Sequence, residues 1–221
     1  MPLVNILKIN SHTSLGIWQY GTERPEATCP HDICKKLQDK CDSRRKEIAA
    51  VYALLRCMTN RSNLRIDHTD NGKPIVTGNG SQDANSYHIG ISHTKGYACV
   101  ILSTASEVSV DIEYVGSRIH KIASRFLAPN EMADITRHDN NTLSNANNSI
   151  EDTTRLLLYW CGKETIYKYY SDNRLTFQNM HINDIGTLKA KGAYTCKNLI
   201  NNATKEIYYM HNDQYVLTYC T

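Results

Sequence analysis

Two carboxylates spaced two residues apart, Asp111 and Glu113, are the first side chains whose types and spacing suggest chemistry. Apolar and polar residues alternate over 108–113, which predicts a strand, and residues two apart in a strand point to the same face. Adjacent carboxylates repel unless a cation or a proton lies between them, and a few hard oxygen ligands suit Mg²⁺ shared with a substrate's phosphates. For this pair alone, a solvent-facing acidic strand end is the simpler interpretation.

The segment 160–168, with the sequence WCGKETIYK, carries the second group of chemically useful side chains. It falls in a helix predicted over 151–170, where Trp160, Glu164 and Lys168 occur at every fourth position and share one stripe. Taken alone, Glu164 and Lys168 are interpreted as a surface ion pair worth ~0.3–0.5 kcal/mol.

The elements that must position these groups follow from periodicity and turn signals. Apolar residues recur every three or four positions from Ile48 to Met58, within a helical stretch predicted over 31–58. Short turn sequences at 94–96 and 104–106 predict that three strands follow one another as antiparallel hairpins. The order of elements predicts an α+β fold of two halves, each a small antiparallel sheet packed with helices. The expected strands are 4–10, 17–18, 87–92, 97–103, 107–113, 180–190, 192–199, 204–211 and 213–220, and the expected helices are 31–58, 117–127, 129–138 and 151–170, with a polar loop over 139–149.

Composition and charge disfavour several classes of protein. The chain has 221 residues, 41% hydrophobic and 21% charged, with a formal net charge of +3. This suits one large domain or two small ones. No apolar run is long enough to cross a membrane, and no basic-then-apolar signal for export is evident. A pI near 8.4 is too mild for a dedicated nucleic-acid binder but suits a phosphate-bearing ligand or an acidic protein partner.

The eight cysteines bear on the compartment. Without an export signal we expect a cytoplasmic protein in which they are free thiols. Cys29, His31, Cys34 and Cys41 lie close together in the sequence, but their spacing fits no standard zinc pattern.

Several pieces of sequence occur together in an order that resembles the 4′-phosphopantetheinyl transferases. The D-I-E triplet at 111–113 and the W-C-x-K-E-x-x-x-K pattern at 160–168 carry most of the resemblance. Gly-Lys-Pro at 72–74 and Ile-Ser-His at 91–93 match landmarks nearer the N-terminus, and Glu131 matches a further acidic position. The joint occurrence is specific, whereas each piece alone is weak.

The resemblance implies a magnesium-dependent transfer from coenzyme A. Members of the family move the 4′-phosphopantetheine arm onto a serine hydroxyl of an apo acyl or peptidyl carrier protein and release 3′,5′-ADP. The length and the D-x-E triplet resemble the monomeric type that activates surfactin synthetase, whose active site lies between two pseudo-symmetric halves. We therefore expect an N-terminal half at 1–105 with the nucleotide contacts, and a C-terminal half at 106–221 with the metal site and carrier-protein docking.

The resemblance also implies roles for the acids and the lysine. Asp111, Glu113 and Glu164 would hold Mg²⁺ beside the pyrophosphate. Serine is a poor nucleophile at neutral pH, so a base must accept its proton. Glu164, directly or through a water, is the first candidate and Glu131 the second, although Glu131 also suits the first turn of its helix electrostatically. Lys168 would protonate or screen the departing phosphate oxygen.

The coenzyme A contacts implied by the resemblance lie mainly in the first half. His93 would donate a hydrogen bond to a phosphate, and Lys73 with the arginine pair at 44–45 would bind the nucleotide's phosphates. The simpler alternatives are turn residues for His93 and Lys73 and a solvated helix surface for the arginines. The full set of expected contacts is Arg44, Arg45, Lys73, Pro74, Ser92, His93 and Lys163.

One departure from the family pattern and one partner surface complete these expectations. Ser109 stands where the pattern usually has Gly, which would allow a close backbone approach. A mildly basic monomer would attract an acidic helical carrier protein. Ile119, Ile122 and Phe126 would pack against that partner or, as the better interpretation, lie on the buried face of their own helix.

Two other functions fit parts of the pattern. A metal-dependent nuclease also uses clustered acids and a lysine, but commonly with E-x-K on a strand, whereas Glu164 and Lys168 lie four apart on a predicted helix. No broad basic surface for DNA is evident either. A non-catalytic relative that binds coenzyme A and a carrier would keep the fold without the reaction. The sequence does not indicate which carrier or pathway is served, or which acyl groups are tolerated.

Overall fold

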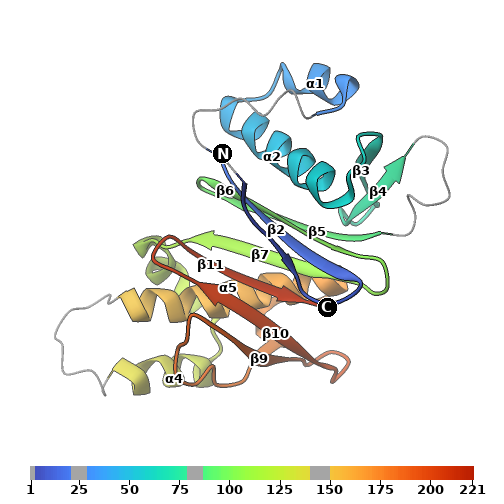
Figure 1. Ribbon diagram of the computed structural model, residues 1–221. Coiled ribbons are helices and arrows are strands. Elements are labelled where there is room, and N and C mark those ends of the chain that lie inside the picture. The colour runs from blue at the N-terminus through green and yellow to red at the C-terminus, as the bar shows by residue number, and fades with distance from the viewer. Residues whose placement is uncertain (1–2, 21–28, 79–86, 140–149) are drawn as a thin grey trace. The chain divides into compact units, whose positions relative to one another are not determined.

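The computed structural model describes residues 3–20, 29–78, 87–139 and 150–221. The chain divides into two units, Met1–Val110 with Thr221, and Asp111–Cys220. The division falls inside strand β7 (Ser109–Tyr114), slightly beyond the boundary expected at 105/106. Both units combine antiparallel strands with helices, which confirms the predicted α+β class (Figure 1). In the described part of the chain, no helix is both long and apolar enough to cross a membrane.

The first unit is built on a four-stranded antiparallel sheet in the order β1-β2-β6-β5, with a separate two-stranded hairpin, β3-β4. Strand β6 is buried along its whole length, because β2 and β5 flank both its edges and α2 packs against it. The apolar face predicted around Val51 and Leu55 provides that packing. The elements are β1 (Leu3–Lys8), β2 (Thr13–Gln19), α1 (His31–Leu37), α2 (Asp42–Thr59), β3 (Leu64–His68), β4 (Pro74–Gly78), β5 (His88–Thr94) and β6 (Tyr97–Ser103).

The long helix expected over 31–58 is two helices. Helix α1 ends at Leu37, and Cys41, with extended backbone angles, precedes the first residue of α2. Asp42 then begins α2 and pairs with Arg45 and Lys46 one turn later. A negative charge in a first turn is favourable, so the local sequence starts a second helix there rather than continuing the first.

The expected hairpin between β6 and β7 is wrong. The β5–β6 hairpin forms as predicted, but β7 belongs to the sheet of the second unit, next to β11. Since β6 already has hydrogen-bonded neighbours on both edges, it offers no edge to a further strand. A short connection therefore did not decide which strands pair.

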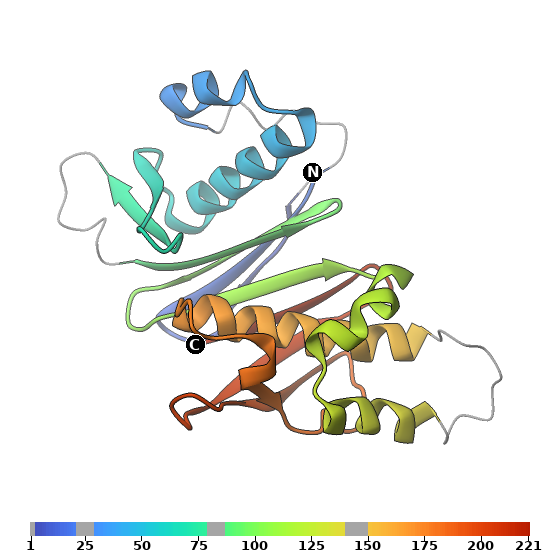
Figure 2. The same cartoon turned by 180° about the vertical axis from the view of Figure 1, so that it is seen from behind.

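The second unit is a five-stranded sheet in the order β7-β11-β10-β9-β8, against which the long helix α5 packs (Figure 2). Leu158 and Ile166 of α5 share a core with Ile207 and Val216 of the sheet. The helix expected over 117–127 is a 3₁₀ turn followed by one turn of α-helix. The elements are β7, η3 (Ser117–Ile122), α3 (Ala123–Phe126), α4 (Pro129–Asp139), α5 (Ile150–Tyr170), η4 (Phe177–Asn179), β8 (Met180–Ile182), β9 (Lys191–Asn198), β10 (Thr204–His211) and β11 (Tyr215–Cys220).

The strand expected over 180–190 is much shorter. Only Met180–Ile182 pairs with β9, and Gly186 then adopts a positive φ of 68°. The side chain of Asp184 accepts a hydrogen bond from the Gly186 amide, so an Asx-type turn replaces the strand. Apart from Asp139, at the end of α4, the polar loop expected over 139–149 lies outside the described residues.

Candidate active site

Strand β7 places the predicted pair of carboxylates. Val110 and Ile112 are fully buried, as the alternating pattern predicts. Asp111 is also largely buried, with 4% of its surface exposed, whereas Glu113 is half-buried near the end of the strand. A buried carboxylate needs a compensating partner, because desolvation penalises its charged form.

Helix α5 supplies that partner and a second one. Nζ of Lys168 donates to Oδ1 of Asp111 at 2.6 Å, and Nε1 of Trp160 donates to Oε1 of Glu113 at 3.2 Å. Trp160, Glu164 and Lys168 thus form one stripe that faces β7, as their fourfold spacing predicts. The helix spacing and the strand spacing together bring two carboxylates, an indole and an ammonium group to one place.

Glu164 lies among the same charges. Burial and then the negative charge of Asp111 raise the pKa of Glu164 to about 7, with a further contribution from Glu113 and an opposing one from Lys168. The three carboxylates are therefore close enough to repel one another. A carboxyl group with this pKa exchanges its proton near neutral pH, which suits a general base.

The donor set has the chemistry of a magnesium site, since it consists of carboxylate oxygens whose repulsion a divalent cation would relieve. In their present positions, however, no three His, Cys, Asp or Glu side chains of the described residues are gathered closely enough to hold a metal ion. In this arrangement Lys168 donates to Asp111, the carboxylate between β7 and α5 that is most buried. The residues fit Mg²⁺ chemically, and joint coordination requires a shift of side chains.

Lys163 and Glu131 form a separate, fully buried ion pair, each with 0% of its surface exposed. Nζ of Lys163 donates to Oε2 of Glu131 at 2.6 Å and to the carbonyls of Phe126 and Phe177 at 2.7 and 3.1 Å. These bonds use all three ammonium protons. Burial lowers the pKa of Lys163, and the partnership with Glu131 opposes this shift.

Both oxygens of Glu131 are used in the same network. Oε2 also accepts from the amide of Ala128 at 2.7 Å, at the start of α4, and Oε1 accepts from the amide of Ile182 at 2.9 Å. The first contact is half of a capping box. Glu131 and Lys163 thus connect η3–α3, α4, α5 and β8 inside the second unit, and neither charged group reaches the surface.

Two phenylalanines fix the ring of Trp160. The rings of Phe126 and Phe177 lie 5.3 and 5.1 Å from the indole, one edge-on and one tilted. The backbone carbonyls of these two phenylalanines accept the hydrogen bonds from Lys163. Phe126 is fully buried and Ile119 is 5% exposed in the core beneath α5, which favours the interpretation that these residues cover their own unit.

A family model described as the 4′-phosphopantetheinyl transferase superfamily matches residues 107–220. This match spans half of the chain and contains both motifs of the site. The chain belongs to the 4′-phosphopantetheinyl transferase superfamily. No curated protein is similar enough to count as a match. The superfamily match includes Asp111, Glu113, Glu164 and Lys168, but it does not extend to the expected coenzyme A contacts in the first unit.

Two of those first-unit residues lie together. Nη1 of Arg44, on α2, lies 2.9 Å from Nε2 of His93 and donates to Glu47 at 3.0 Å. The carboxylate of Glu47 is also 3.6 Å from Nδ1 of His93. Glu47 was not among the residues expected at a site, although its position three residues after Arg44 on a predicted helix indicates that the two side chains are neighbours.

The other expected contacts of the first unit are dispersed. Arg45 pairs with Asp42, and Pro74 begins strand β4. Ser92 is buried on β5. The ammonium group of Lys73 pairs with Glu107, a partner that no local pattern indicates.

Glu107 has two basic partners. His88 Nδ1 lies 2.8 Å from Oε1 of Glu107, whose other oxygen pairs with Lys73. Burial acts to raise the pKa of Glu107, but the hydrogen bonds from Lys73 and His88 outweigh it and lower that pKa. Lys73 is therefore fixed at its end of the β3–β4 hairpin by a charge pair.

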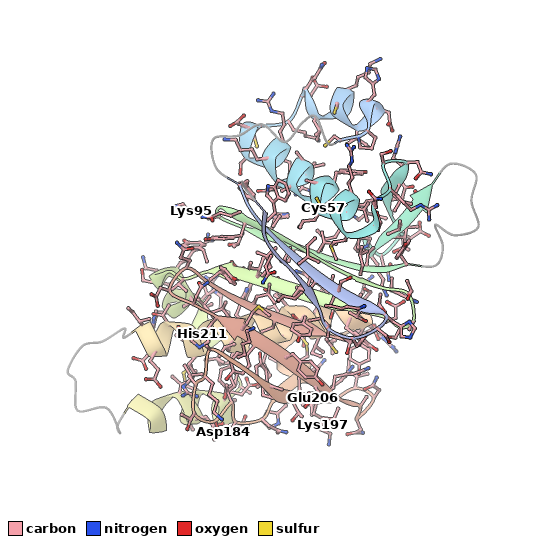
Figure 3. The ribbon with its side chains drawn as sticks, viewed as in Figure 1. Cys57, Lys95, Asp184, Lys197, Glu206 and His211 are labelled. Atoms are coloured by element: carbon pink, nitrogen blue, oxygen red, sulfur yellow. The ribbon has the colours of Figure 1, made fainter. Side chains whose placement is uncertain are left out.

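An open cavity of about 590 Å³ lies at the start of α2. Its lining combines Lys46 and Glu47 of the helix with Thr94, Lys95 and Gly96 of the β5–β6 turn. Figure 3 marks Lys95 at the tip of that hairpin. Thr94, which follows His93, lines the cavity, and the charged side chains of the lining are Asp42, Lys46, Glu47 and Lys95.

Proposed function

We propose that the chain catalyses the magnesium-dependent transfer of 4′-phosphopantetheine from coenzyme A to a serine of an acyl or peptidyl carrier protein, releasing 3′,5′-ADP. The observation that carries the proposal is the meeting of Asp111, Glu113, Glu164 and Lys168 on β7 and α5, in a chain that belongs to this superfamily. Three acids and a cationic hydrogen-bond donor are the groups that phosphoryl transfer to a hydroxyl needs.

The carboxylates are proposed to bind Mg²⁺. Asp111, Glu113 and Glu164 would hold it, and when bound it would neutralise negative charge on the pyrophosphate. Burial raises the pKa of Glu164 most, and the negative charges of Asp111 and Glu113 raise it further. This repulsion supports the assignment, because it favours a cation. For the cation to contact Asp111 fully, Lys168 must turn away from that carboxylate, to which it now donates.

The proton and the leaving group each have a proposed partner. Glu164 accepts the proton of the carrier serine while the serine oxygen forms a bond to the phosphorus of the pantetheine phosphate. Lys168 donates to the phosphate oxygen that departs as the pyrophosphate bond breaks. Glu164 lies among the charges of Asp111, Glu113 and Lys168 and is assigned the first role, whereas Glu131 is fully buried and paired with Lys163.

Residues of the first unit are proposed to bind the phosphates of coenzyme A. Arg44 and His93 lie within hydrogen-bonding distance of each other and form one candidate phosphate contact. The neighbouring cavity, with Lys46 and Lys95, forms another. A guanidinium group binds a terminal phosphate through two parallel bonds, so Arg44 is the stronger of the arginine candidates.

Intact mass spectrometry of a panel of apo carrier proteins tests the function. With coenzyme A and Mg²⁺, we expect at least one carrier to gain the mass of one phosphopantetheine arm. Glu164→Gln should abolish the gain, whereas Glu151→Gln, an exposed glutamate on the same helix, should retain it. If no carrier gains mass while a competent transferase modifies the same panel, the proposal is wrong. Binding of coenzyme A without transfer would instead favour a non-catalytic relative.

A further inference from the structure

The indole N–H of Trp160 is the only polar group of its side chain, and it points at a proposed metal ligand. The hydrogen bond to Oε1 of Glu113 joins the two elements of the site, because Trp160 lies on α5 and Glu113 on β7. This bond, 3.2 Å long, holds Oε1 of the carboxylate. A ligand held in this way keeps its orientation when a cation arrives.

The position of this N–H is itself determined by packing. Phe126 and Phe177 contact the indole from different elements, so the ring has little freedom to rotate. Lys163 donates to the carbonyls of both phenylalanines, which couples the two clamping segments to α5. The buried ion pair with Glu131 then fixes Lys163. Hydrogen bonds and ring contacts thus connect the buried pair of Glu131 and Lys163, through Trp160, to Glu113.

We propose that Trp160 is a positioning residue, whose indole N–H orients the Glu113 carboxylate as a ligand for Mg²⁺. The inference rests on the proposed function, since it assumes that Glu113 is a metal ligand. Trp160 touches neither substrate nor the reacting atoms in this role. Partners of metal ligands typically contribute about 10- to 100-fold in metal affinity, which sets the scale of the effect.

Mg²⁺ binding, measured by titration calorimetry without coenzyme A or carrier, tests the inference. Trp160→Phe removes the N–H and keeps an aromatic ring between Phe126 and Phe177. We expect it to weaken Mg²⁺ binding about tenfold or more. Trp18→Phe is the matched control, because it makes the same substitution in the core of the first unit and should keep wild-type Mg²⁺ affinity.

Two further measurements separate positioning from general loss of structure. In the Glu113→Ala protein, which lacks the acceptor, Trp160→Phe should cause little additional loss of Mg²⁺ affinity, because the two groups act through one contact. In the Trp18→Phe protein, Trp160 is the only tryptophan, and its fluorescence should change as Mg²⁺ is added. A merely structural role of Trp160 produces neither result.

The outcomes distinguish this inference from the proposed function. Equal Mg²⁺ affinity in the Trp160→Phe and Trp18→Phe proteins would overturn the inference while leaving the transfer reaction untouched. Fully additive losses in the double variant, or a wild-type protein that binds no Mg²⁺, would also overturn it. Failure of every carrier to gain mass would contradict the function alone, since a tenfold loss of Mg²⁺ affinity in Trp160→Phe still supports the positioning role.

Discussion

Lys168 Nζ lies 2.6 Å from Oδ1 of Asp111, so an ammonium group already bonds a carboxylate that the proposed function assigns to Mg²⁺. The side chain of Asp111 is 5% exposed and that of Lys168 33%, which makes this a partly buried, charge-assisted contact. Under the proposed function, Lys168 and Mg²⁺ therefore compete for one carboxylate.

The first prediction concerns this competition. Lys168→Met should lower the free energy of unfolding without Mg²⁺ by about 1–3 kcal/mol, because Asp111 loses a charged donor. Mg²⁺ should then stabilise the variant more than the wild type, since no ammonium group has to be displaced. Thermal unfolding with and without Mg²⁺ measures both effects, and mass spectrometry should show no transfer.

Lys205→Met provides the control for Lys168→Met. Lys205 donates to the hydroxyl of Tyr169 at 2.6 Å and lies over its ring, so it loses comparable contacts away from the carboxylates. Its Mg²⁺ response should equal that of the wild type. Equal Mg²⁺-induced shifts in melting temperature for Lys168→Met and the wild type would contradict the competition.

The second prediction is a pH dependence caused by Glu164. Its pKa is about 7 in the folded protein and 4.5 ordinarily, so between these values the folded state retains a proton that the unfolded state loses. The free energy of unfolding without Mg²⁺ should therefore fall as pH rises from about 4.5 through 7, by roughly 2–3 kcal/mol. Urea unfolding at pH 5 and pH 8 in the presence of EDTA measures this difference.

Glu164→Gln removes the group that titrates. Its free energy of unfolding should vary less between pH 5 and pH 8 than that of the wild type, and it should exceed the wild-type value at pH 8. The same dependence on pH in both proteins would show that another group is responsible.

The third prediction distinguishes a structural Glu131 from a catalytic one. Glu131→Gln leaves the ammonium group of Lys163 buried without its counter-charge, which should cost about 3–5 kcal/mol. Lys163→Met should destabilise the protein similarly, and the double variant should lose less than the sum of the two. Urea unfolding gives these values. A Glu131→Gln protein as stable as the wild type but inactive would restore Glu131 as a candidate base.

The fourth prediction concerns the residue that departs from the family pattern. The hydroxyl of Ser109 is buried and has no hydrogen-bond partner among the residues that the structure describes. Ser109→Ala should therefore raise the free energy of unfolding by about 1 kcal/mol. Ser103→Ala is the contrasting variant, because the Ser103 hydroxyl bonds Thr13 and two backbone amides and its loss should destabilise. Destabilisation by Ser109→Ala in urea unfolding would contradict this interpretation.

Much of the local structure and the elements that carry the site can be predicted from side chains that recur at every second residue of a strand or every fourth residue of a helix. The alternation before Glu113 predicted β7, and the spacing of Trp160, Glu164 and Lys168 predicted their common stripe on α5. Such patterns are reliable because side-chain direction along a strand or helix depends only on nearby residues. The same motifs indicated the superfamily that the match over 107–220 shows.

Other features depend on residues far apart in the sequence. That β7 joins β11 instead of β6 was decided by which strand edges were already occupied. Glu131 and Lys163 match motif positions, yet the core encloses both, and its hydrogen bonds use both carboxylate oxygens and all three ammonium protons.

The sequence by itself therefore determined which chemical groups the site contains and on which elements they lie, because those are properties of short segments. Only the tertiary structure decided which groups reach one another: Lys168 with Asp111, Trp160 with Glu113, and Lys163 with Glu131. The physical reason is that burial and pairing depend on what the rest of the chain leaves open, and that cannot be determined from neighbouring residues.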